Sequence, residues 1–285
     1  MNGFVILNKK SGISSFSAIS VFKKKFNIEK CGHMGTLDPL AGGVLVVGTG
    51  KAVRLFDYLL AKEKMYIAQF KFGEQTDTLD TTGTVTATDN KIIMERDILN
   101  ILSEFKGNIK QTPPAYSAKS INGVRAYKLA RKNIEVSLPE KEVFIKEIKL
   151  LSSDGENLFT FEITCGGGTY IRSIARDMGN KLSTYAVMSK LTRTRAGAFK
   201  IEDAIAEEDY ENIKNIENVL IKCENVIDYK EIRLNNIKKT LLDGIKVNCN
   251  AENGNYKVFD GGEFLGIGET ANGRLKIKVW LNENN

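Results

Sequence analysis

The stretch Gly32-His33-Met34-Gly35-Thr36-Leu37-Asp38-Pro39-Leu40-Ala41-Gly42-Gly43-Val44-Leu45 is the most informative part of this sequence of 285 residues. It is rich in glycine and has no helical spacing of apolar residues, so residues 31–43 are predicted to form an ordered loop before a buried strand at 44–47. Asp38 stands directly before Pro39, and a residue before proline is pushed toward extended backbone. The direction of this carboxylate is therefore partly fixed. An Asx-Pro turn is the structural alternative to a catalytic role.

The composition is that of an ordinary globular chain with a mild excess of positive charge. Hydrophobic residues make up 42% and charged residues 27%, which is typical neither of disordered nor of fibrous proteins. Lys and Arg number 41 against 35 Asp and Glu, which gives a net charge of +6. This excess favours a polyanionic partner, although a solvated basic surface would have the same composition.

Cysteine spacing and the start of the chain indicate a compartment. The 4 cysteines lie far apart with no Cys-x-x-Cys pair, so neither a disulfide framework nor a zinc ribbon is indicated. The first residues are too weakly apolar for a secretory signal, and no stretch reaches the ~18 apolar residues of a membrane span. A cytoplasmic protein without membrane attachment is expected. His33 is the only histidine, so a site with several histidine ligands is excluded.

Hydrophobic spacing predicts strands and helices in alternation, followed by a smaller β-rich module. Residues 4–7 and 66–72 read as strands, and apolar residues at helical spacing predict a helix capped by Ser17 and another at 171–182. From about residue 227 short strands are separated by Asp-Gly-Gly and Asn-Gly turns. The sequence therefore predicts two domains of unequal size.

Several further segments, taken in order with residues 32–45, resemble the motifs of one enzyme family. They are 48–54 (Gly-Thr-Gly-Lys-Ala-Val-Arg), 64–66 (Lys-Met-Tyr), 73–83 (Gly-Glu-Gln-Thr-Asp-Thr-Leu-Asp-Thr-Thr-Gly), 114–118 (Pro-Ala-Tyr-Ser-Ala), 168–177 (Gly-Thr-Tyr-Ile-Arg-Ser-Ile-Ala-Arg-Asp) and 191–197 (Leu-Thr-Arg-Thr-Arg-Ala-Gly). Together they resemble the bacterial tRNA pseudouridine-55 synthases of the TruB type. The resemblance covers most of residues 3–200.

The resemblance implies a fold and an activity. The fold is α+β, with a mixed, largely antiparallel sheet flanked by helices in a catalytic domain of residues 1–227, which carries an RNA-gripping insertion at about 111–139. Residues 228–285 resemble, faintly, a small PUA-like RNA-binding domain rich in β structure. The implied reaction isomerises uridine 55 in the T arm of tRNA to pseudouridine by base flipping, without cofactor or metal. The implied partner is tRNA, and a monomer without an obligate protein partner is expected.

The resemblance also assigns three catalytic residues. Asp38 matches the essential aspartate, which either bonds to the nucleotide or removes a sugar proton; both roles need an ionised carboxylate. Arg172 is expected to face Asp38 and to favour that ionised form. Tyr66 is expected to stack on the uracil and to accept the C5 proton late in the reaction. Taken alone, Arg172 could be a helix-surface arginine and Tyr66 the first aromatic residue of a strand face.

Further residues are assigned to substrate binding by the same resemblance. They are His33, which contacts the RNA as the base flips; Asp80, near the flipped nucleotide; Tyr170 and Leu191, which line the pocket; and Arg54, a phosphate contact. Asp77 is chemically as good an acceptor as Asp80, and His33 and Leu191 could equally be satisfied structural residues. Tyr170 lies two residues before Arg172, so if both reach the pocket the backbone there cannot be simple helix.

One departure from the family pattern and two rival functions complete the sequence evidence. Lys10 stands where relatives have a proline after Lys9, so a turn prearranged by proline is lost. The first rival is a noncatalytic RNA-binding or tRNA-folding factor. The second is a nucleoside or glycoside hydrolase, for which Asp80 would be the second carboxylate. The glycines at 166–168 could cradle a phosphate, but they lack the spacing of a nucleotide-binding motif.

Overall fold

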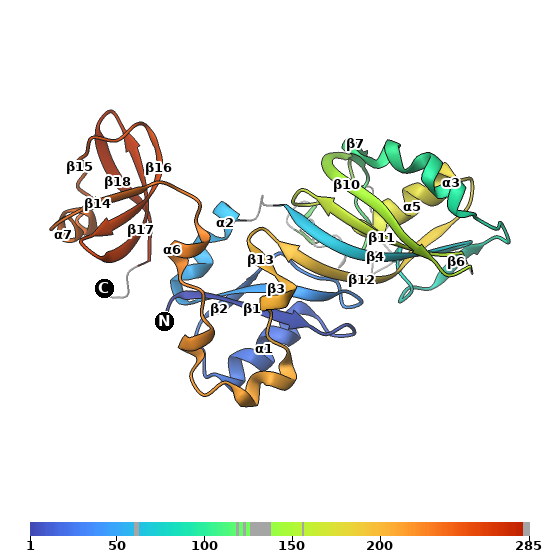
Figure 1. Ribbon diagram of the computed structural model, residues 1–285, viewed down its shortest axis with the longest axis horizontal. Coiled ribbons are helices and arrows are strands. Elements are labelled where there is room, and N and C mark those ends of the chain that lie inside the picture. Colours follow the sequence, from blue (N-terminus) through green and yellow to red (C-terminus); the bar gives the residue numbers. More distant parts are fainter. Residues whose placement is uncertain (60–62, 118–119, 122–123, 126–137, 156, 282–285) are drawn as a thin grey trace.

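Two separate β-sheets lie toward the two ends of an elongated molecule (Figure 1). The computed structural model describes residues 1–59, 63–117, 120–121, 124–125, 138–155 and 157–281. The first sheet contains β1 (Gly3–Lys9), β2 (Cys31–Met34), β3 (Gly42–Thr49), β4 (Lys64–Phe72), β7 (Gly107–Gln111), β10 (Lys141–Ser153), β11 (Leu158–Cys165), β12 (Ala186–Ala196) and β13 (Phe199–Lys200). Its helices are α1 (Ser15–Lys25), η1 (Gly50–Leu55), α2 (Phe56–Leu59), α3 (Glu95–Ile101), η2 (Leu102–Phe105) and α5 (Ile171–Lys181).

The strand order of this sheet is β1-β3-β12-β4-β11-β10-β7, with β2 added to β3 and β13 to β12. Its strand pairs are antiparallel except for β12 with β3, which run parallel. The predicted α+β fold with a mixed, largely antiparallel sheet is confirmed. Two hairpins stand beside the sheet: β5 (Glu74–Thr76) with β6 (Val85–Thr88), and β8 (Ser120–Ile121) with β9 (Val124–Arg125).

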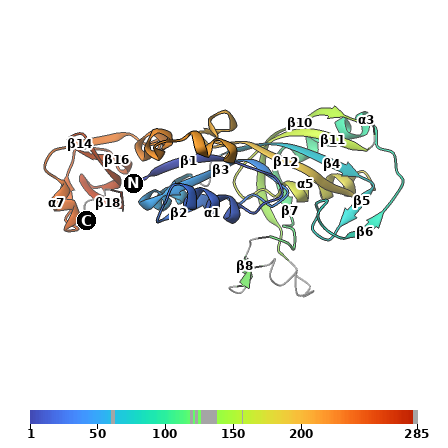
Figure 2. The same ribbon diagram turned by 90° about the horizontal axis from the view of Figure 1, so that it is seen from below.

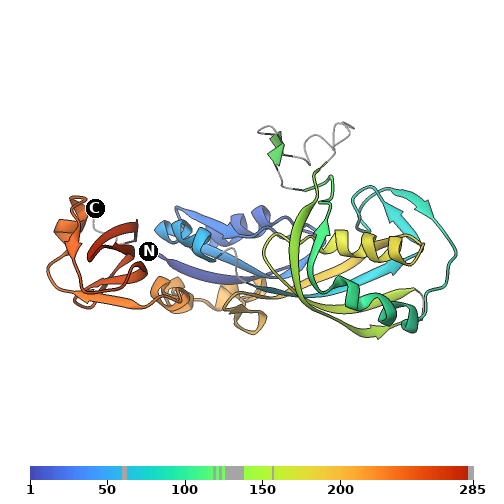
Figure 3. The same ribbon diagram turned by 90° about the horizontal axis from the view of Figure 1, so that it is seen from above.

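Alternation along the strands divides the core between the two faces of the sheet. In β1, Val5 and Leu7 join the cluster formed with α1, α3 and α5, whereas Phe4 and Ile6 join a second cluster with η1. This follows from the period of two in a strand, which sends successive side chains to opposite faces. Figure 3 shows α1, in blue, and α5, in yellow, on the same side of the sheet.

The predicted loop at 31–43 is wrong in its first part. Residues 31–34 form β2, which pairs antiparallel with β3 so that Met34 lies opposite Val46. Only Met34 of these four residues is buried, so the strand lacks the continuous apolar run that would have revealed it. The first helix also begins earlier than expected: its N-cap is Ser14, whose hydroxyl accepts a hydrogen bond from the Ser17 backbone N–H (3.0 Å).

After the large sheet the chain crosses to the second sheet through short helical turns. These are η3 (Ile201–Asp203), η4 (Glu207–Asn212), η5 (Ile216–Val219) and α6 (Cys223–Val226). The second sheet has the order β14 (Glu231–Leu234), β16 (Gly254–Asp260), β17 (Glu263–Ala271), β18 (Arg274–Trp280), β15 (Val247–Asn248), with α7 (Lys238–Leu242) beside it. Its own core includes Val258, Leu265 and Leu275. The boundary between residues 227 and 228 stays a prediction.

The insertion predicted at about 111–139 lies largely outside the described residues. The parts that are described include Gln111 at the end of β7 and the β8–β9 hairpin, and Figure 2 shows β8 standing away from the large sheet. Residues 111–117 turn back toward α5, where Gln111 Nε2 donates to Tyr170 O (3.0 Å) and the Tyr170 N–H donates to Gln111 Oε1 (2.8 Å). The start of the insertion is thereby fixed to the N-cap of α5.

Gly43 is the position where the large sheet tolerates least change. Its φ is +92°, and a Cβ added there would lie 2.3 Å from Arg193 O. Gly43→Ala is therefore expected to lower the free energy of unfolding by roughly 2–5 kcal/mol, because positive φ and overpacking both act. Gly107 has a similar φ of +83° with nothing within 4 Å of the added Cβ, so Gly107→Ala is the control. If urea unfolding showed the same loss of free energy of unfolding in both variants, the close approach of Gly43 to Arg193 would contribute nothing to stability.

Candidate active site

A cavity of about 560 Å³ opens between the loop before β3, strands β4 and β12, and the start of α5. It is lined by Gly35, Thr36, Leu37, Asp38, Lys64, Tyr66, Ser117, Gly167, Gly168, Thr169, Tyr170, Ile171, Arg172, Met188, Leu191 and Arg193. The three predicted catalytic residues and two of the predicted substrate-binding residues, Tyr170 and Leu191, are therefore brought together from four separate parts of the chain.

The loop that carries Asp38 is held from below by hydrogen bonds. The Ser15 hydroxyl, at the start of α1, donates to Leu37 O (3.0 Å) and accepts from the Leu37 N–H (2.9 Å). Lys9 Nζ donates to Pro39 O (3.3 Å), and the Gly12 N–H donates to the same carbonyl (2.7 Å). These bonds fix the residues on both sides of Asp38, so its carboxylate is presented by a rigid segment.

Lys9 keeps its place under the loop although no proline follows it. It is 2% exposed, and its ammonium group also donates to Lys10 O (2.9 Å). The Lys10 side chain points to solvent and pairs with Glu208 (3.1 Å). The buried ammonium group of Lys9 thus donates hydrogen bonds to backbone carbonyls, and these bonds hold the turn in place of the missing proline.

Arg172 and Asp38 form the central ion pair of the cavity. Arg172 Nε lies 2.9 Å from Asp38 Oδ2, and the arginine side chain is 5% exposed. Its other nitrogens donate to Thr78 O (Nη1, 2.7 Å) and Tyr116 O (Nη2, 3.0 Å). A guanidinium group with all three nitrogens engaged has a fixed plane. Asp38 itself is 36% exposed toward the cavity, so one edge of its carboxylate faces the space where a ligand would lie.

Asp80 lies behind Arg172 and is absent from the residues that line the cavity. Its Oδ2 is 3.7 Å from Arg172 Nη1, while its Oδ1 accepts from the Thr82 N–H (3.0 Å) and the Thr78 hydroxyl (2.9 Å). Asp77, the alternative acceptor, is exposed and accepts from the Tyr116 hydroxyl (3.3 Å). Asp80 is therefore the second carboxylate beside the arginine, placed to support it.

Tyr66, Tyr170 and Leu191 form the aromatic and apolar walls. Tyr66, on β4, is 7% exposed, and Leu191, on β12, is 8% exposed. Tyr170 is the N-cap of α5 with extended backbone (φ −101°, ψ 110°), so it and Arg172 both line the cavity because the helix begins between them. Lys141 Nζ lies 4.9 Å from the centre of the Tyr170 ring. These walls present aromatic and apolar surface to the cavity.

His33 and Arg54 are placed elsewhere. His33 is on β2 opposite Val47, and its buried Nδ1 has no hydrogen-bond partner among the described residues. Burial and the charge of Arg193 lower the pKa of this imidazole. Arg54 is exposed on η1, where its Nη1 donates to Trp280 O (3.4 Å). Neither residue lines the cavity, so any contact they make with a substrate lies outside it.

Two cations in the cavity wall were not singled out from the sequence. Lys64, which is 7% exposed, and Arg193, which is 1% exposed, lie in the quoted segments 64–66 and 191–197. Strand alternation puts Lys64 in phase with Tyr66 and Arg193 in phase with Leu191, but cations in a strand ordinarily face solvent. That phase, together with the resemblance to the motif, was the signal that could have found them.

Enclosure of Asp38 raises the pKa of its carboxyl above the ordinary value; the charges of Arg172 and Lys9 oppose this rise and Asp80 adds to it. Arg172 thus limits the effect of burial without reversing it.

The raised pKa of Asp38 predicts how activity depends on pH. Since only the ionised form is expected to be active, activity should be lost, as pH falls, at a pH above the ~3.9 of an ordinary aspartate. Single-turnover rates on saturating RNA between pH 4 and 8, with circular dichroism to monitor folding, would measure this. A loss of activity only at or below the ordinary aspartate pKa of ~3.9 would contradict this prediction.

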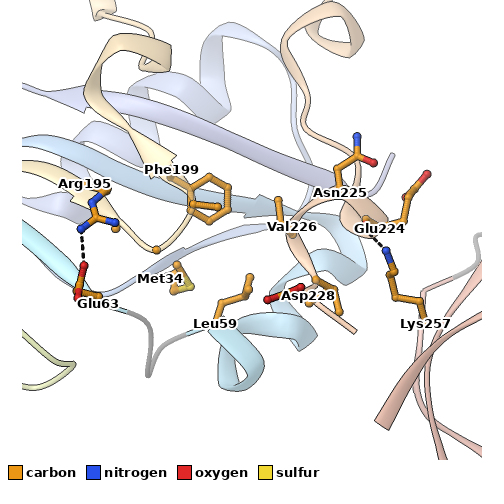
Figure 4. Close-up of a pocket in the computed structure, with 14 residues that line it drawn as sticks. Met34, Leu59, Glu63, Arg195, Phe199, Glu224, Asn225, Val226, Asp228 and Lys257 are labelled. Carbon is orange, nitrogen blue, oxygen red and sulfur yellow. Dashed lines mark hydrogen bonds and ion pairs between the residues drawn. The ribbon is translucent and has the colours of Figure 1, made fainter. Parts of the chain in front are cut away.

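A larger cavity, of about 740 Å³, lies between the end of β12, α6 and the second sheet (Figure 4). Two of its cations have partners: Arg195 bonds to the Glu63 carboxylate, and Lys257 Nζ donates to the backbone carbonyl of Glu224 (3.4 Å). None of the predicted catalytic residues lines it. Size alone therefore does not identify the active site, and the smaller cavity with its Asp38–Arg172 pair is the candidate.

The part of the chain that the structure describes contains no group of three or more His, Cys, Asp or Glu side chains that could hold a metal ion. None of its helices is long and apolar enough to cross a membrane.

Comparisons with known proteins agree with this architecture. A chain from the structure of an H/ACA RNP bound to a substrate RNA containing 2′-deoxyuridine matches 99% of this chain and 86% of its own length, with a TM-score of 0.72 at 22% identity. A chain from the crystal structure of a Cbf5-Nop10-Gar1 complex matches 94% of this chain and 78% of its own, with a TM-score of 0.69 at 24% identity. At this identity the likeness establishes the fold.

Sequence comparison identifies the family. The model of the TruB family pseudouridylate synthase N-terminal domain matches residues 23–171. The tRNA pseudouridine synthase B of Mycoplasma mobile is 39% identical over 98% of this chain and 94% of its own length, and that of Clostridium tetani is 38% identical over 97% and 98%. Fold and relatives together define an isomerase of the pseudouridine synthase class. Within that class, the chain belongs to the TruB family.

Proposed function

We propose that this enzyme converts uridine 55 in the T arm of tRNA to pseudouridine, with Asp38 as its essential carboxylate. The relatives that match nearly the whole chain are named tRNA pseudouridine synthase B, which supports tRNA as the substrate. The single observation that carries the proposal is the 2.9 Å contact between Arg172 Nε and Asp38 Oδ2 at the wall of a cavity that Tyr66 also lines.

The reaction determines what the cavity has to do. The bond from N1 of uracil to C1′ breaks, a bond from C5 to C1′ forms, the C5 proton leaves, and N1 gains a proton. Between these steps the detached uracil must turn without escaping. The walls formed by Tyr66, Tyr170 and Leu191 suit this task, because they offer aromatic and apolar surface against which a ring can turn.

Asp38 and Tyr66 supply the reacting groups in this proposal. Asp38 either bonds to the nucleotide or removes a sugar proton, and both roles use its ionised form, which Arg172 favours. Tyr66 accepts the C5 proton in the last stage. Burial raises the pKa of Tyr66, so its phenol needs a nearby cation to share the negative charge that develops, and Arg193 faces it.

The target base has to leave the RNA stack to reach this cavity, at a cost of about a few kcal/mol. The net charge of +6 supports attraction to the phosphate backbone. In this proposal His33, Arg54 and the insertion at about 111–139 contact the RNA around the cavity, and the second domain binds RNA as well. The positions of His33 and Arg54 outside the cavity wall suit contacts to the surrounding RNA and not to the flipped base.

A T-arm stem-loop carrying tritium at C5 of uridine 55 tests the proposal. Wild-type protein is expected to release the tritium, and a stem-loop with cytidine at position 55 and labelled uridines elsewhere should release none. If the labelled stem-loop binds but keeps its tritium, the proposal fails. Free uracil as a product would instead indicate a hydrolase, which the structure does not favour because both oxygens of Asp80 face partners in Arg172, Thr78 and Thr82.

We also propose that the enzyme works in the cytoplasm as a monomer without an obligate protein partner. The support is that one chain supplies every side chain of the cavity named above. Light scattering after size-exclusion chromatography, with and without the stem-loop, should give the mass of one chain and of a one-to-one complex. A stable dimer would contradict this.

A further inference from the structure

Arg193 is the largest fully buried side chain among the described residues, yet it has no carboxylate partner there. Moving a guanidinium group out of water without an opposing charge costs several kcal/mol, so such a residue is normally retained only where its hydrogen bonds have a use. The ion pair with Asp38 does not account for the burial of Arg193, because that pair is formed by Arg172 on α5.

The hydrogen bonds of Arg193 reach both ends of the Asp38 loop. Its Nε donates to Val44 O (2.7 Å) and its Nη2 donates to Gly35 O (3.1 Å). These two carbonyls stand on either side of Asp38 in the sequence, so one planar group spans the base of the loop. A flexible ammonium group could not satisfy both acceptors in a fixed plane.

The backbone of Arg193 connects the same loop to the strand that carries Tyr66. Arg193 lies opposite Gly43 of β3 on one side and opposite Tyr66 of β4 on the other. Its guanidinium group lines the same cavity as Tyr66, and its charge acts on the Tyr66 phenol. Arg193 is therefore in direct contact with both segments whose side chains react in the proposed mechanism.

The charge of Arg193 acts on Tyr66 in the direction that the proposed reaction needs. It opposes the rise that burial causes in the pKa of Tyr66, and hydrogen bonding adds to this effect. A phenol that accepts a proton must carry negative charge for part of the reaction, and a preorganised buried cation stabilises that charge. Burial lowers the pKa of Lys9 and of Lys64, and the charge of Arg193 adds to this lowering at both residues.

We propose that Arg193 is a positioning residue that fastens the Asp38 loop to Tyr66 and orients the Tyr66 phenol for removal of the C5 proton. This inference rests on the proposed function, since it takes the roles of Asp38 and Tyr66 from there. It gives the two arginines different roles: Arg172 pairs with the Asp38 carboxylate, whereas Arg193 positions the Asp38 loop and the Tyr66 phenol.

The test compares Arg193→Met and Arg193→Lys with Arg195→Met as the matched control. Arg195 lies two residues further along β12, is 31% exposed and pairs with Glu63 away from this cavity. Single-turnover conversion of a T-arm stem-loop is measured at saturating protein, with either hydrogen or deuterium at C5 of the target uridine. Dissociation constants for the stem-loop and thermal unfolding are measured in parallel.

Arg193→Met is expected to slow conversion by roughly 10²-fold or more, with little change in RNA affinity. Its C5 deuterium isotope effect should exceed that of the wild type, because removal of the C5 proton becomes more strongly rate-limiting. Arg193→Lys keeps the charge and should lose less rate, and Arg195→Met should resemble the wild type. A general loosening of the structure would slow conversion without raising the isotope effect.

An unchanged isotope effect in a slowed Arg193→Met variant, or a rate within threefold of the wild type, would overturn the inference. If that variant does not fold, Arg193→Lys decides: an isotope effect above the wild-type value supports the inference, and a wild-type value refutes it. Failure of the proposed function is recognised separately, because then the wild-type protein itself would release no hydrogen from C5.

Discussion

Asp38→Asn is expected to lower the rate of pseudouridine formation by on the order of 10⁴-fold or more while leaving RNA affinity nearly unchanged. The amide has almost the shape of the carboxylate, but it can neither bond to the nucleotide nor remove a proton as the ionised group can. The Arg172 Nε contact at 2.9 Å can be kept by the amide oxygen, so the loop should stay in place. Tritium release and a filter-binding constant, measured on the same stem-loop, separate chemistry from binding.

The matched control for this variant is Asp209→Asn, which makes the same chemical change at an exposed carboxylate on η4. Its rate should stay within a factor of about three of the wild type, as expected for a surface substitution away from the site. If Asp38→Asn kept more than a tenth of the wild-type rate, Asp38 would not be the essential carboxylate. The noncatalytic RNA-binding alternative predicts instead that neither the wild type nor the variant forms product.

Arg172→Lys is expected to lower the single-turnover rate by roughly 10²–10³-fold, although the positive charge is retained. Arg172 contacts Asp38, Thr78 O and Tyr116 O through three different nitrogens. A lysine can place one nitrogen at one of these positions and leaves the other acceptors unsatisfied. The measurement is the rate on saturating stem-loop, with thermal unfolding to show that the variant is folded.

Arg176→Lys is the control for this second prediction, because Arg176 lies about one turn further along α5 and pairs with Asp177. Its rate should be close to that of the wild type. A similar loss in both variants would mean that disturbance of the helix, and not the contact with Asp38, slows the reaction. Arg172→Met should in addition reduce the free energy of unfolding by about 1–3 kcal/mol, since it leaves Thr78 O and Tyr116 O without their hydrogen-bond donor.

The parts of the site that could be predicted from the sequence are those whose geometry is local or carried by a motif. Pro39 restricts the backbone at Asp38, and the spacing of Tyr170 and Arg172 required the break from extended backbone to helix that the structure shows. The pairing of Arg172 with Asp38 came from resemblance alone. No local rule brings together two residues so distant in sequence.

The missed features depend on tertiary context. Ser17 and Ser14 are equally good caps by type, and only the direction in which the chain enters α1 selects Ser14. Arg193 and Arg195 look alike in sequence, yet one is 1% exposed and the other is 31% exposed, because a register shift in β12 separates them. His33 and Arg54 lie outside the cavity wall, and their predicted contacts with RNA stay predictions.

Strand β12 has a consequence for how the enzyme is made. It lies between β3 and β4, which do not pair with each other, and it follows them by more than a hundred residues of chain. During synthesis the Asp38 loop and Tyr66 therefore leave the ribosome long before the strand that sets their separation. Such long-range pairing is slow to form. A nascent chain that ends before Ala196 should be inactive, whereas release of β12 should complete the catalytic geometry in one cooperative step.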